Sequence, residues 1–389
     1  MTYAAAWQGL APADLLRPAT KRALPFPFGT DRPTFFYRAR NAIYHLARAL
    51  RLDERGPVLV PDYHHGNEVA ALRAARVKVE FYPIRRDFGP DLDALDHQCR
   101  SGIGALFVIH YLGWPQPLDP LEALCRKHGL LLIEDCALSL LSEDGGVPLG
   151  SRGDYGIYCL YKTLPLPNGG VLVQNNRQLP RLERPRQRPC SRAAVVGRSA
   201  ELMLEWLRGS ADPIGRVLCG AKRTAGRALS ALGVRREPVG DTGFSVADAD
   251  LAMSSMCHML LQKLDYEAIR SRRRANFEQL RRALDGRVTL PRSDLPGGMC
   301  PLFLPLLVSD KEAASRELTR RGVGNVQFWN RGDAEADARM TPDVRWLRRH
   351  VLEIPIHQGL SASKVDYVAQ QVLALGSLLD QRAFEERAA

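Results

Sequence analysis

Short apolar segments alternate with helical segments between Phe35 and Asn175, and this alternation constrains the fold more than any other feature. The strand-like segments are Val58–Pro61, Lys78–Tyr82, Gly104–His110, Leu130–Glu134 and Gly169–Gln174. Apolar residues at helical spacing lie between them, over Ala39–Leu52, Asn67–Ala75 and Pro120–His128. Strands that alternate with helices in this way form a mostly parallel sheet covered on both faces. The pattern therefore predicts an α/β fold.

The chain changes character after Asn176. A Pro/Arg-rich run is followed by two helix-like pieces, Ala193–Leu207 and Ile214–Leu232, in which apolar residues recur at helical spacing beside arginines and lysines. We interpret 178–240 as a helical insertion that packs on the rest of the protein. A basic amphipathic surface that docks on an anionic membrane, or covers a long acidic substrate, is an alternative that we do not favour.

The C-terminal third predicts a second, smaller α/β unit. A long helix is expected from Ala247 through Leu284. It is followed by strands at Cys300–Val308, Val326–Trp329 and Glu353–Pro355 and by helices at Lys311–Gly322, Val344–Leu352 and Ser361–Leu379. We therefore expect a large domain over 1–246, and over 247–389 a connecting helix with a small C-terminal domain.

Composition excludes several classes of protein. The net charge is +11, but the basic residues are spread along the chain and no nucleic-acid recognition motif accompanies them, so we expect no nucleic-acid partner. The eight cysteines form no CxxC pair and no Cys/His spacing for zinc, so we expect reduced thiols and no metal. The chain has no signal-peptide pattern and no apolar run long enough to span a membrane, which predicts a cytoplasmic protein.

Two residues stand where a parallel sheet places its chemistry. Asp135 directly follows the apolar strand at Leu130–Glu134, at the edge where open α/β sheets bind ligands. Lys162 leaves a short strand into a proline-containing loop that Gly169 and Gly170 close. A lysine removed from water can form an imine with an aldehyde.

An aspartate and a lysine on neighbouring strands are what pyridoxal phosphate (PLP) chemistry needs. The aspartate keeps the pyridine nitrogen protonated, and the lysine holds the aldehyde and moves a proton. A structural Asp–Lys pair would give the same spacing, so both interpretations stay open on these two residues alone.

Four further stretches bear a family resemblance. They are VPDYHHGNEV (Val60–Val69), LLIEDCALS (Leu131–Ser139), YKTLPLPNGGVLV (Tyr161–Val173) and VLEIPIHQGLSASKVDYVAQQV (Val351–Val372). In this order and separation they resemble the DegT/StrS family of PLP-dependent sugar aminotransferases over roughly 35–375. The resemblance implies the fold-type I PLP transferase fold and a homodimer.

The resemblance also implies roles for single residues. Lys162 corresponds to the Schiff-base lysine and Asp135 to the partner of the pyridine nitrogen. His65 stands where the family stacks an aromatic ring on the cofactor, although a histidine in a turn is an alternative. Arg40 and Asn41 belong to the segment at the family's phosphate-binding helix start, where backbone N–H groups receive an anion; a helix-capping arginine is the alternative for Arg40.

The chain departs from the family at four places. The arginine–asparagine motif that reaches the phosphate of the partner subunit's cofactor is not recognisable near Phe244–Met253. Leu138 stands where the family has a glutamine that bonds the cofactor's phenolic oxygen. The stretch before Lys162 is shorter than usual and lacks the serine that contacts the phosphate. The block over 178–240 has no counterpart in the family pattern.

The resemblance implies a PLP-dependent aminotransferase. Its expected reaction transfers an amino group from glutamate or glutamine to a keto-sugar, nucleotide-linked, in polysaccharide or secondary-metabolite biosynthesis. Two alternatives stay open: a PLP enzyme of another reaction type, such as a dehydratase, and a catalytically silent protein with the same fold. Because Lys162 is retained where the family's dehydratases have histidine, transamination is the preferred interpretation.

Overall fold

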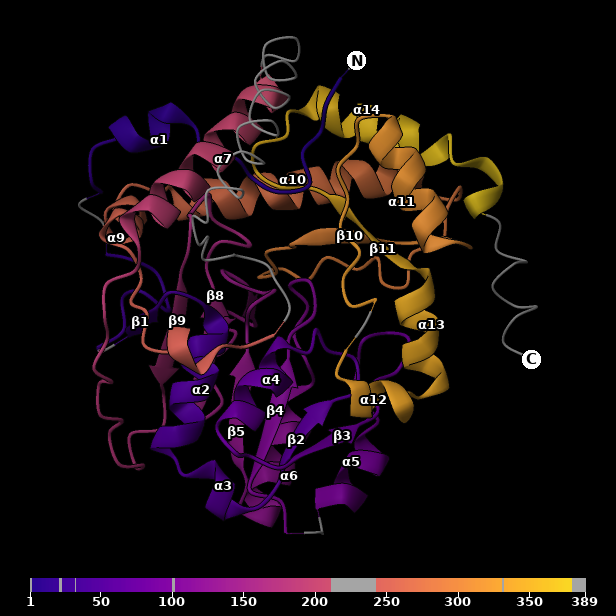
Figure 1. Ribbon diagram of the computed structural model, residues 1–389. Coiled ribbons are helices and arrows are strands. Elements are labelled where there is room, and N and C mark those ends of the chain that lie inside the picture. The colour runs from indigo at the N-terminus through magenta and orange to yellow at the C-terminus, as the bar shows by residue number, and fades with distance from the viewer. Residues whose placement is uncertain are drawn as a thin grey trace.

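A seven-stranded sheet forms the centre of the computed structural model (Figure 1). The structure describes residues 2–20, 23–31, 33–99, 102–210, 243–330 and 332–379. The strand order is β1-β9-β8-β5-β4-β2-β3. Because this order differs from the order along the chain, helical connections cross the faces of the sheet, as the alternating sequence pattern predicts.

Five strands of this sheet run parallel. They are β2 (Val58–Pro61), β3 (Val79–Tyr82), β4 (Ala105–Ile109), β5 (Leu131–Asp135) and β8 (Tyr155–Cys159). Every residue of β2, β4, β5 and β8 is buried, as expected of strands covered on both faces. At one edge, β9 (Gly170–Gln174) runs antiparallel to both of its neighbours, β8 and β1 (Thr34–Phe36). The prediction of an α/β fold with a mostly parallel sheet is confirmed.

The helices around the sheet follow the predicted ranges with small changes. They are α1 (Pro12–Leu16), α2 (Ala39–Ala49), α3 (Leu52–Arg55), α4 (Asn67–Ala74), α5 (Leu92–Cys99) and α6 (Leu118–His128). The helix expected over Ala39–Leu52 ends at Ala49, because Arg51 has a φ of 49°, outside the helical region. In the sequence between β5 and β8, β6 (Glu143–Asp144) and β7 (Val147–Pro148) form a separate small hairpin.

The single long helix predicted from Ala247 is wrong. The structure has instead a short 3-10 turn η1 (Val246–Asp248), α9 (Ser255–Leu261) and α10 (Tyr266–Leu284). Ser254 and Asp265 each accept a hydrogen bond from a backbone N–H of the following helix, so each starts a new helix. Before this region, α7 (Arg192–Ser210) matches the first helix-like piece of the insertion. The second piece, Ile214–Leu232, lies outside the described residues.

The C-terminal part pairs a two-stranded antiparallel sheet with helices. Its strands are β10 (Phe303–Leu307) and β11 (Val351–Pro355), and its helices are α11 (Lys311–Arg320), α12 (Ala334–Ala338), α13 (Pro342–His350), α14 (Ala362–Leu373) and the 3-10 turn η2 (Gly376–Leu379). The strand predicted over Val326–Trp329 is wrong, since only Val326 pairs, in a single bridge with Glu353. The Trp329 ring of this segment packs against the rings of Tyr63 and Tyr111, which follow β2 and β4.

One buried apolar cluster joins the two parts of the molecule. It contains residues of the central sheet, such as Leu106 and Ile133, and residues of the C-terminal part, such as Phe303 and Ile354. The domain division between 246 and 247 therefore stays a prediction. No helix of the described ranges is long and apolar enough to cross a membrane.

Candidate active site

Asp135 is the last residue of β5, at the carboxyl edge of the parallel strands. In the sheet it lies opposite Ile157 of β8, and its Oδ1 accepts a hydrogen bond from the backbone N–H of Ala137 at 2.8 Å. Burial and the nearby Glu68 carboxylate raise the pKa of Asp135 to about 7. A carboxyl group with this pKa can share a proton with a basic partner near neutral pH.

Lys162 stands in the turn that follows β8. Backbone bonds from Thr163 and Leu164 to the carbonyl of Leu160 build this turn, and Leu160 in turn donates to Gly169. Gly169 has a φ of +140°, which other residues rarely adopt, so a glycine is needed where the loop returns. Within the described part of the chain, the Nζ atom of Lys162 has no hydrogen-bond partner, and it lies 5.6 Å from the centre of the Phe328 ring.

Both residues line one cavity of about 340 Å³ between the edge of the sheet and the C-terminal part. The N-terminal segment, α2, α4, α7 and the segment before α12 all contribute to its wall. Four of the five residues predicted for the site line this cavity: Lys162, Asp135, His65 and Arg40. The fifth, Asn41, is not part of the lining.

His65 lies just before α4 and beside Glu68. Its backbone N–H donates to Oε1 of Glu68 at 2.9 Å. Burial lowers the pKa of His65 to about 4, so the imidazole is neutral at physiological pH. Burial alone would raise the pKa of Glu68, but the adjacent imidazoles and backbone N–H groups hold it below its ordinary value. The cavity thus has a flat neutral ring next to a buried carboxylate.

Arg40 and Asn41 lie on the first turn of α2 and make different contacts. Arg40 donates to the Oδ1 atom of Asn67 at 3.1 Å and to the carbonyl of Gly243. The side chain of Asn41 donates to the carbonyls of Asp248 and Ala249, at 2.6 and 2.9 Å. Asn41 therefore connects α2 to the segment around η1, and its role in cofactor binding stays a prediction.

Arg38 begins the segment predicted at the phosphate-binding helix start and lines the cavity, although only Arg40 and Asn41 were predicted as cofactor-binding residues. It precedes α2 at the N-cap position, and only 6% of it is exposed. Its Nε and Nη2 atoms are buried and have no hydrogen-bond partner in the described part of the chain. Its guanidinium carbon lies 5.0 Å from the centre of the Tyr37 ring, an aromatic contact that supplies no counter-charge. A buried cation without an anion is costly, so this end of the cavity suits an anionic ligand.

Other lining residues were also absent from the sequence prediction. Leu138, one of the departures from the family pattern, is buried against the cavity beside Asp135. Trp7, Arg198 and Phe328 come from the N-terminal segment, α7 and the segment between α11 and α12. No motif marks them, because they meet only through contacts between distant parts of the chain.

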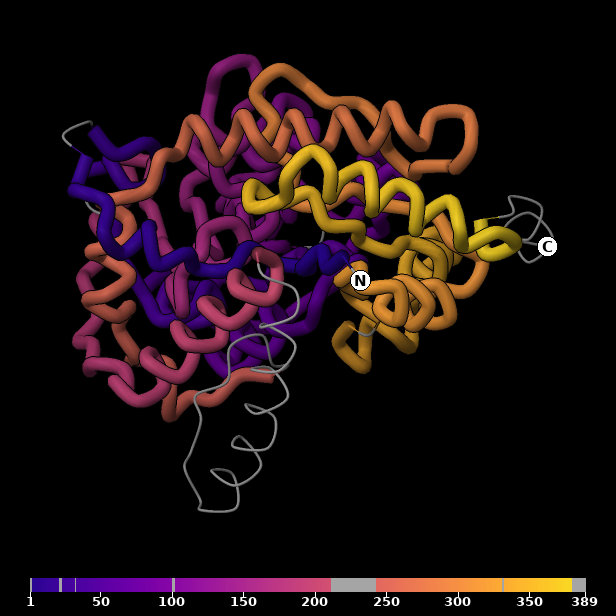
Figure 2. The backbone as a smooth tube through the Cα atoms, turned by 90° about the horizontal axis from the view of Figure 1, so that it is seen from above, coloured from indigo at the N-terminus to yellow at the C-terminus, as the bar shows by residue number. Residues whose placement is uncertain are grey.

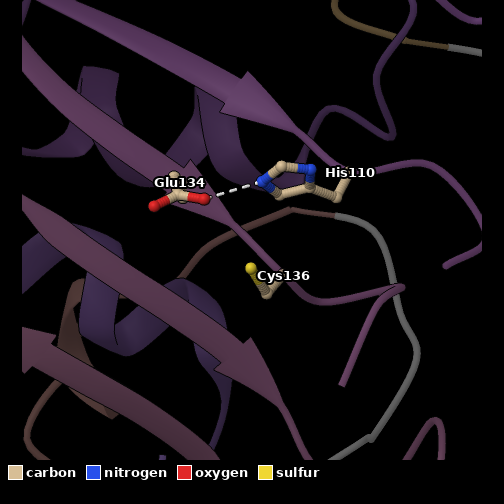
Figure 3. Close-up of side chains that lie close together, drawn as sticks. All are labelled: His110, Glu134 and Cys136. Carbon is tan, nitrogen blue, oxygen red and sulfur yellow. Dashed lines mark hydrogen bonds and ion pairs between the residues drawn. The ribbon is translucent and has the colours of Figure 1, made fainter. Parts of the chain in front are cut away.

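His110, Glu134 and Cys136 lie behind Asp135, and Figure 3 shows the His110 and Glu134 side chains pointing toward each other. The Nδ1 atom of His110 accepts from the backbone of Gln116, so its Nε2 carries the proton donated to Glu134 at 2.9 Å. Glu134 also accepts hydrogen bonds from the backbone N–H groups of three residues, Gly150, Arg152 and Gly153. These hydrogen bonds occupy the Glu134 carboxylate. We therefore interpret Glu134 as an anchor between the loop before β8 and the end of β5, and not as a metal ligand.

The cavity therefore combines a lysine amine, a carboxyl group that titrates near neutrality, a neutral imidazole and an arginine without an anionic partner. Such a set can hold an aromatic ligand that carries an aldehyde, a basic ring nitrogen and an anionic group.

Comparison with known proteins gives a family match over part of the chain and a fold over the whole chain. Residues 39–195 match the DegT/DnrJ/EryC1/StrS aminotransferase family. A UDP-4-amino-4,6-dideoxy-N-acetyl-beta-L-altrosamine transaminase of Campylobacter jejuni is 30% identical over 146 residues, which are 36% of this chain and 39% of that protein. An L-glutamine:2-deoxy-scyllo-inosose aminotransferase of Streptoalloteichus tenebrarius is 33% identical over 112 residues, 27% of this chain and 26% of that protein. The chain thus matches well under half of each relative's length.

Two solved structures resemble the whole chain. The aminotransferase PseC of Helicobacter pylori, involved in pseudoaminic acid biosynthesis, superimposes with a TM-score of 0.65 at 15% identity and covers 99% of this chain and 100% of its own. A Streptococcus pneumoniae protein solved in its PLP form gives a TM-score of 0.68 at 13% identity, with 100% of both chains covered. At these identities the likeness shows the fold.

Proposed function

We propose that this chain, whose residues 39–195 belong to the DegT/DnrJ/EryC1/StrS aminotransferase family, is a PLP-dependent aminotransferase that acts on a keto-sugar. One observation carries the proposal: Asp135 and Lys162 line the same cavity from adjacent parallel strands, as an acid and an amine at the reactive edge of the sheet.

Lys162 is the proposed site of covalent attachment and of proton transfer. When bound, PLP supplies an aldehyde that accepts the amino group and a pyridine ring that withdraws electrons. The Nζ atom of Lys162 has no competing hydrogen bond among the described residues, so its lone pair is available when it is deprotonated. With the cofactor bound, the Nζ atom of Lys162 would act as the general base that takes a proton from the substrate carbon and as the acid that gives it back.

Asp135 is the proposed partner of the ring nitrogen. Its carboxyl group is buried and held by the Ala137 N–H, so it has one defined orientation. With a pKa near 7, it is close to the point at which it can pass its proton to a pyridine and remain as the counter-charge. His65, neutral at physiological pH, is proposed to cover one face of the ring.

Arg38 is the proposed holder of the cofactor's phosphate, in place of the serine that this chain lacks. Its unpartnered Nε and Nη2 atoms supply two buried donors with a fixed fork geometry, which suits a phosphate. Arg40, on the first turn of α2, adds a second positive charge to the same cavity. The residues present therefore fit the cofactor at both ends, the lysine end and the phosphate end.

The substrates follow from the relatives. One acts on a UDP-linked amino sugar and another uses L-glutamine to aminate a cyclitol ketone. We propose glutamate or glutamine as the donor and a keto-sugar as the acceptor for this chain. The resemblance further implies a homodimer and the division into 1–246 and 247–389. Sedimentation at micromolar concentration tests the dimer, and an active monomer would contradict it.

The deciding experiment uses the purified protein with added PLP. We expect an absorbance band at the blue edge of the visible spectrum, removed by borohydride, and transfer of the glutamate amino group to a UDP-linked keto-sugar. Lys162→Ala is expected to lose both, whereas the exposed-surface control Lys127→Ala keeps them. An unchanged band in Lys162→Ala would refute the lysine assignment, and a wild-type protein with the band but without transfer would favour the silent protein.

A further inference from the structure

The N-terminal segment from Tyr3 to Leu10, here called the N-terminal strap, connects two parts of the molecule that are distant in sequence. At one end Ala4 exchanges backbone hydrogen bonds with Gly322 and Gly324 of the C-terminal part, at 3.0 and 2.8 Å. At the other end the N–H of Leu10 donates to the carbonyl of Leu202 on α7 at 3.1 Å. Figure 2 shows this indigo segment running between α7 and the yellow α14.

The strap is closely packed at both ends. A Cβ on Gly9 would lie 2.4 Å from the backbone nitrogen of Trp206, and one on Gly324 would lie 2.4 Å from the backbone nitrogen of Ala6. Glycine is therefore required for both approaches. Because its backbone is fixed at α7 and at the C-terminal part, the strap holds the residue between these anchors, Trp7, in a defined place.

Trp7 contributes to the cavity wall near the reactive lysine. Its ring centre lies 6.0 Å from that of Phe328, and the Phe328 ring centre lies 5.6 Å from the Nζ atom of Lys162. Trp7 is only partly buried and lines the cavity together with Leu202 of α7. An indole on a cavity wall can pack against the apolar C–H face of a sugar ring.

Arg198 adds a charge to the same wall. It stands on α7 one helical turn before Leu202, and its Nη1 donates to Glu201 at 2.9 Å. Its Nε atom is buried and has no hydrogen-bond partner within the residues that the structure describes. One donor of the guanidinium is thus committed to the protein, and another remains for a ligand.

We propose that Trp7 and Arg198 form the acceptor-binding wall, and that Arg198 selects a keto-sugar bearing a phosphate or diphosphate over an uncharged ketone. This inference rests on the proposed aminotransferase function and deepens it. The relatives act on acceptors of both kinds, a nucleotide-linked sugar and a cyclitol. Arg198 is ion-paired with Glu201 through Nη1, so its Nε–H provides the discrimination: a charge-assisted hydrogen bond to a phosphate oxygen is stronger than one to a neutral hydroxyl.

The first test measures binding without turnover. UDP, dTDP and GDP are titrated by calorimetry into the wild type, Arg198→Gln and the control Arg192→Gln, an exposed arginine of the same helix. We expect Arg198→Gln to weaken diphosphate binding about 10-fold or more, the loss typical of one charged hydrogen bond. The control is expected to bind as the wild type does. Equal binding by Arg198→Gln and wild type, or no binding by wild type, overturns the proposal.

The second test separates the acceptor wall from the cofactor site. In the PLP-loaded enzyme, Arg198→Gln should raise the KM for a UDP-linked keto-sugar about 10-fold, and Trp7→Ala should raise it about 5-fold. Trp7→Phe keeps an aromatic ring at this position, so its KM should be close to that of the wild type. The half-reaction with glutamate, followed by the visible absorbance, should keep the wild-type rate. Loss of that half-reaction with an unchanged acceptor KM contradicts the proposal.

These outcomes also distinguish this inference from the proposed function. If wild type binds no PLP but binds diphosphates through Arg198, the aminotransferase function fails while the anion site stands. If PLP binds and transamination proceeds with equal acceptor KM values in Arg198→Gln and wild type, the function stands and the wall assignment fails. Thermal unfolding of each variant shows whether a change in KM accompanies loss of the fold.

Discussion

The Nζ atom of Lys162 lies 5.6 Å from the centre of the Phe328 ring, so the sheet and the C-terminal part meet at this lysine. Two buried side chains fix the backbone of Phe328. The ammonium group of Lys311 donates to its carbonyl at 2.9 Å, and Oε2 of Glu353 accepts from its N–H at 3.0 Å. The wall facing Lys162 thus depends on a lysine and a glutamate that do not line the cavity.

Lys311→Met is expected to destabilise the protein by about 3 kcal/mol, because it removes the positive charge that offsets the burial of Glu353 and the donor to the Phe328 carbonyl. Burial already raises the pKa of Glu353 to about 7, and Lys311 opposes this rise. Urea unfolding at neutral pH measures the loss. Lys127→Met, on an exposed ion pair with Asp96, serves as control and should change stability by less than about 1 kcal/mol. If Lys311→Met and Lys127→Met lower the free energy of unfolding equally, the buried Lys311 does not stabilise the protein more than an exposed lysine does.

Asp135→Asn is expected to reduce turnover by about 100-fold or more, since a neutral amide cannot keep the pyridine nitrogen protonated. The same change should stabilise the cofactor-free protein. Burial raises the pKa of Asp135 from 3.8 to about 7. As the pH rises, the Asp135 carboxyl group therefore loses its proton in the unfolded protein before it does so in the folded protein. The free energy of unfolding of the wild type thus falls between about pH 4 and about pH 7.

The stability difference between Asp135→Asn and wild type should therefore grow over this pH range and level off above it, at about 2–4 kcal/mol. Denaturant unfolding of both proteins at several pH values measures the difference. A gap that is independent of pH would show that Asp135 is ionised throughout. Activity near the wild-type level would assign the ring nitrogen to another residue.

Arg38→Gln is expected to weaken PLP binding by about 10–100-fold, the effect of losing hydrogen bonds from a charged group. Binding of pyridoxal, which lacks the phosphate, should remain as in wild type. The control is Arg48→Gln, an exposed arginine at the other end of α2. Equilibrium titration followed by visible absorbance gives both affinities. If Arg38→Gln lowers the affinities for PLP and for pyridoxal by the same factor, Arg38 does not hold the phosphate.

Glu134→Gln tests the support behind Asp135. The two carboxylate oxygens of Glu134 accept hydrogen bonds from His110 and from three backbone N–H groups. A glutamine side chain has only one acceptor oxygen. At least one buried donor would lose its partner, at a cost of about 1–3 kcal/mol each. Thermal unfolding measures the effect, with exposed Asp144→Asn as control. A stability loss no larger than that of the control would show that the loop does not depend on Glu134.

Much of the sheet could be predicted because buried parallel strands leave a strong local signal. The apolar runs at Val58–Pro61 and Leu131–Asp135 are strands in the structure within a residue of the predicted bounds. Lys162 and Asp135 could be paired for the same reason, since topology places the ends of adjacent parallel strands at one edge. In these cases local pattern and tertiary structure agree.

The errors occur where side-chain capping or tertiary contacts decide the structure. Apolar spacing continues past Gln262, but the Asp265 side chain starts a new helix there. The apolar stretch over Val326–Trp329 resembles a strand, yet its backbone is held by Lys311 and Glu353 instead of a ladder. Arg38 looks like any arginine before an amphipathic helix, because its burial depends on elements that fold around it.

The two anchors of the N-terminal strap also affect when the cavity wall can form during synthesis of the chain. Ala4 is translated before the central sheet, but its partners at Gly322 and Gly324 are translated only after the sheet and α7. Until then the strap has only one of its two anchors, and a chain translated as far as α7 lacks the C-terminal wall of the cavity. A nascent chain can therefore form much of its sheet while its active site is still open. The cavity wall is complete only after the segment that contains Phe328 has been made.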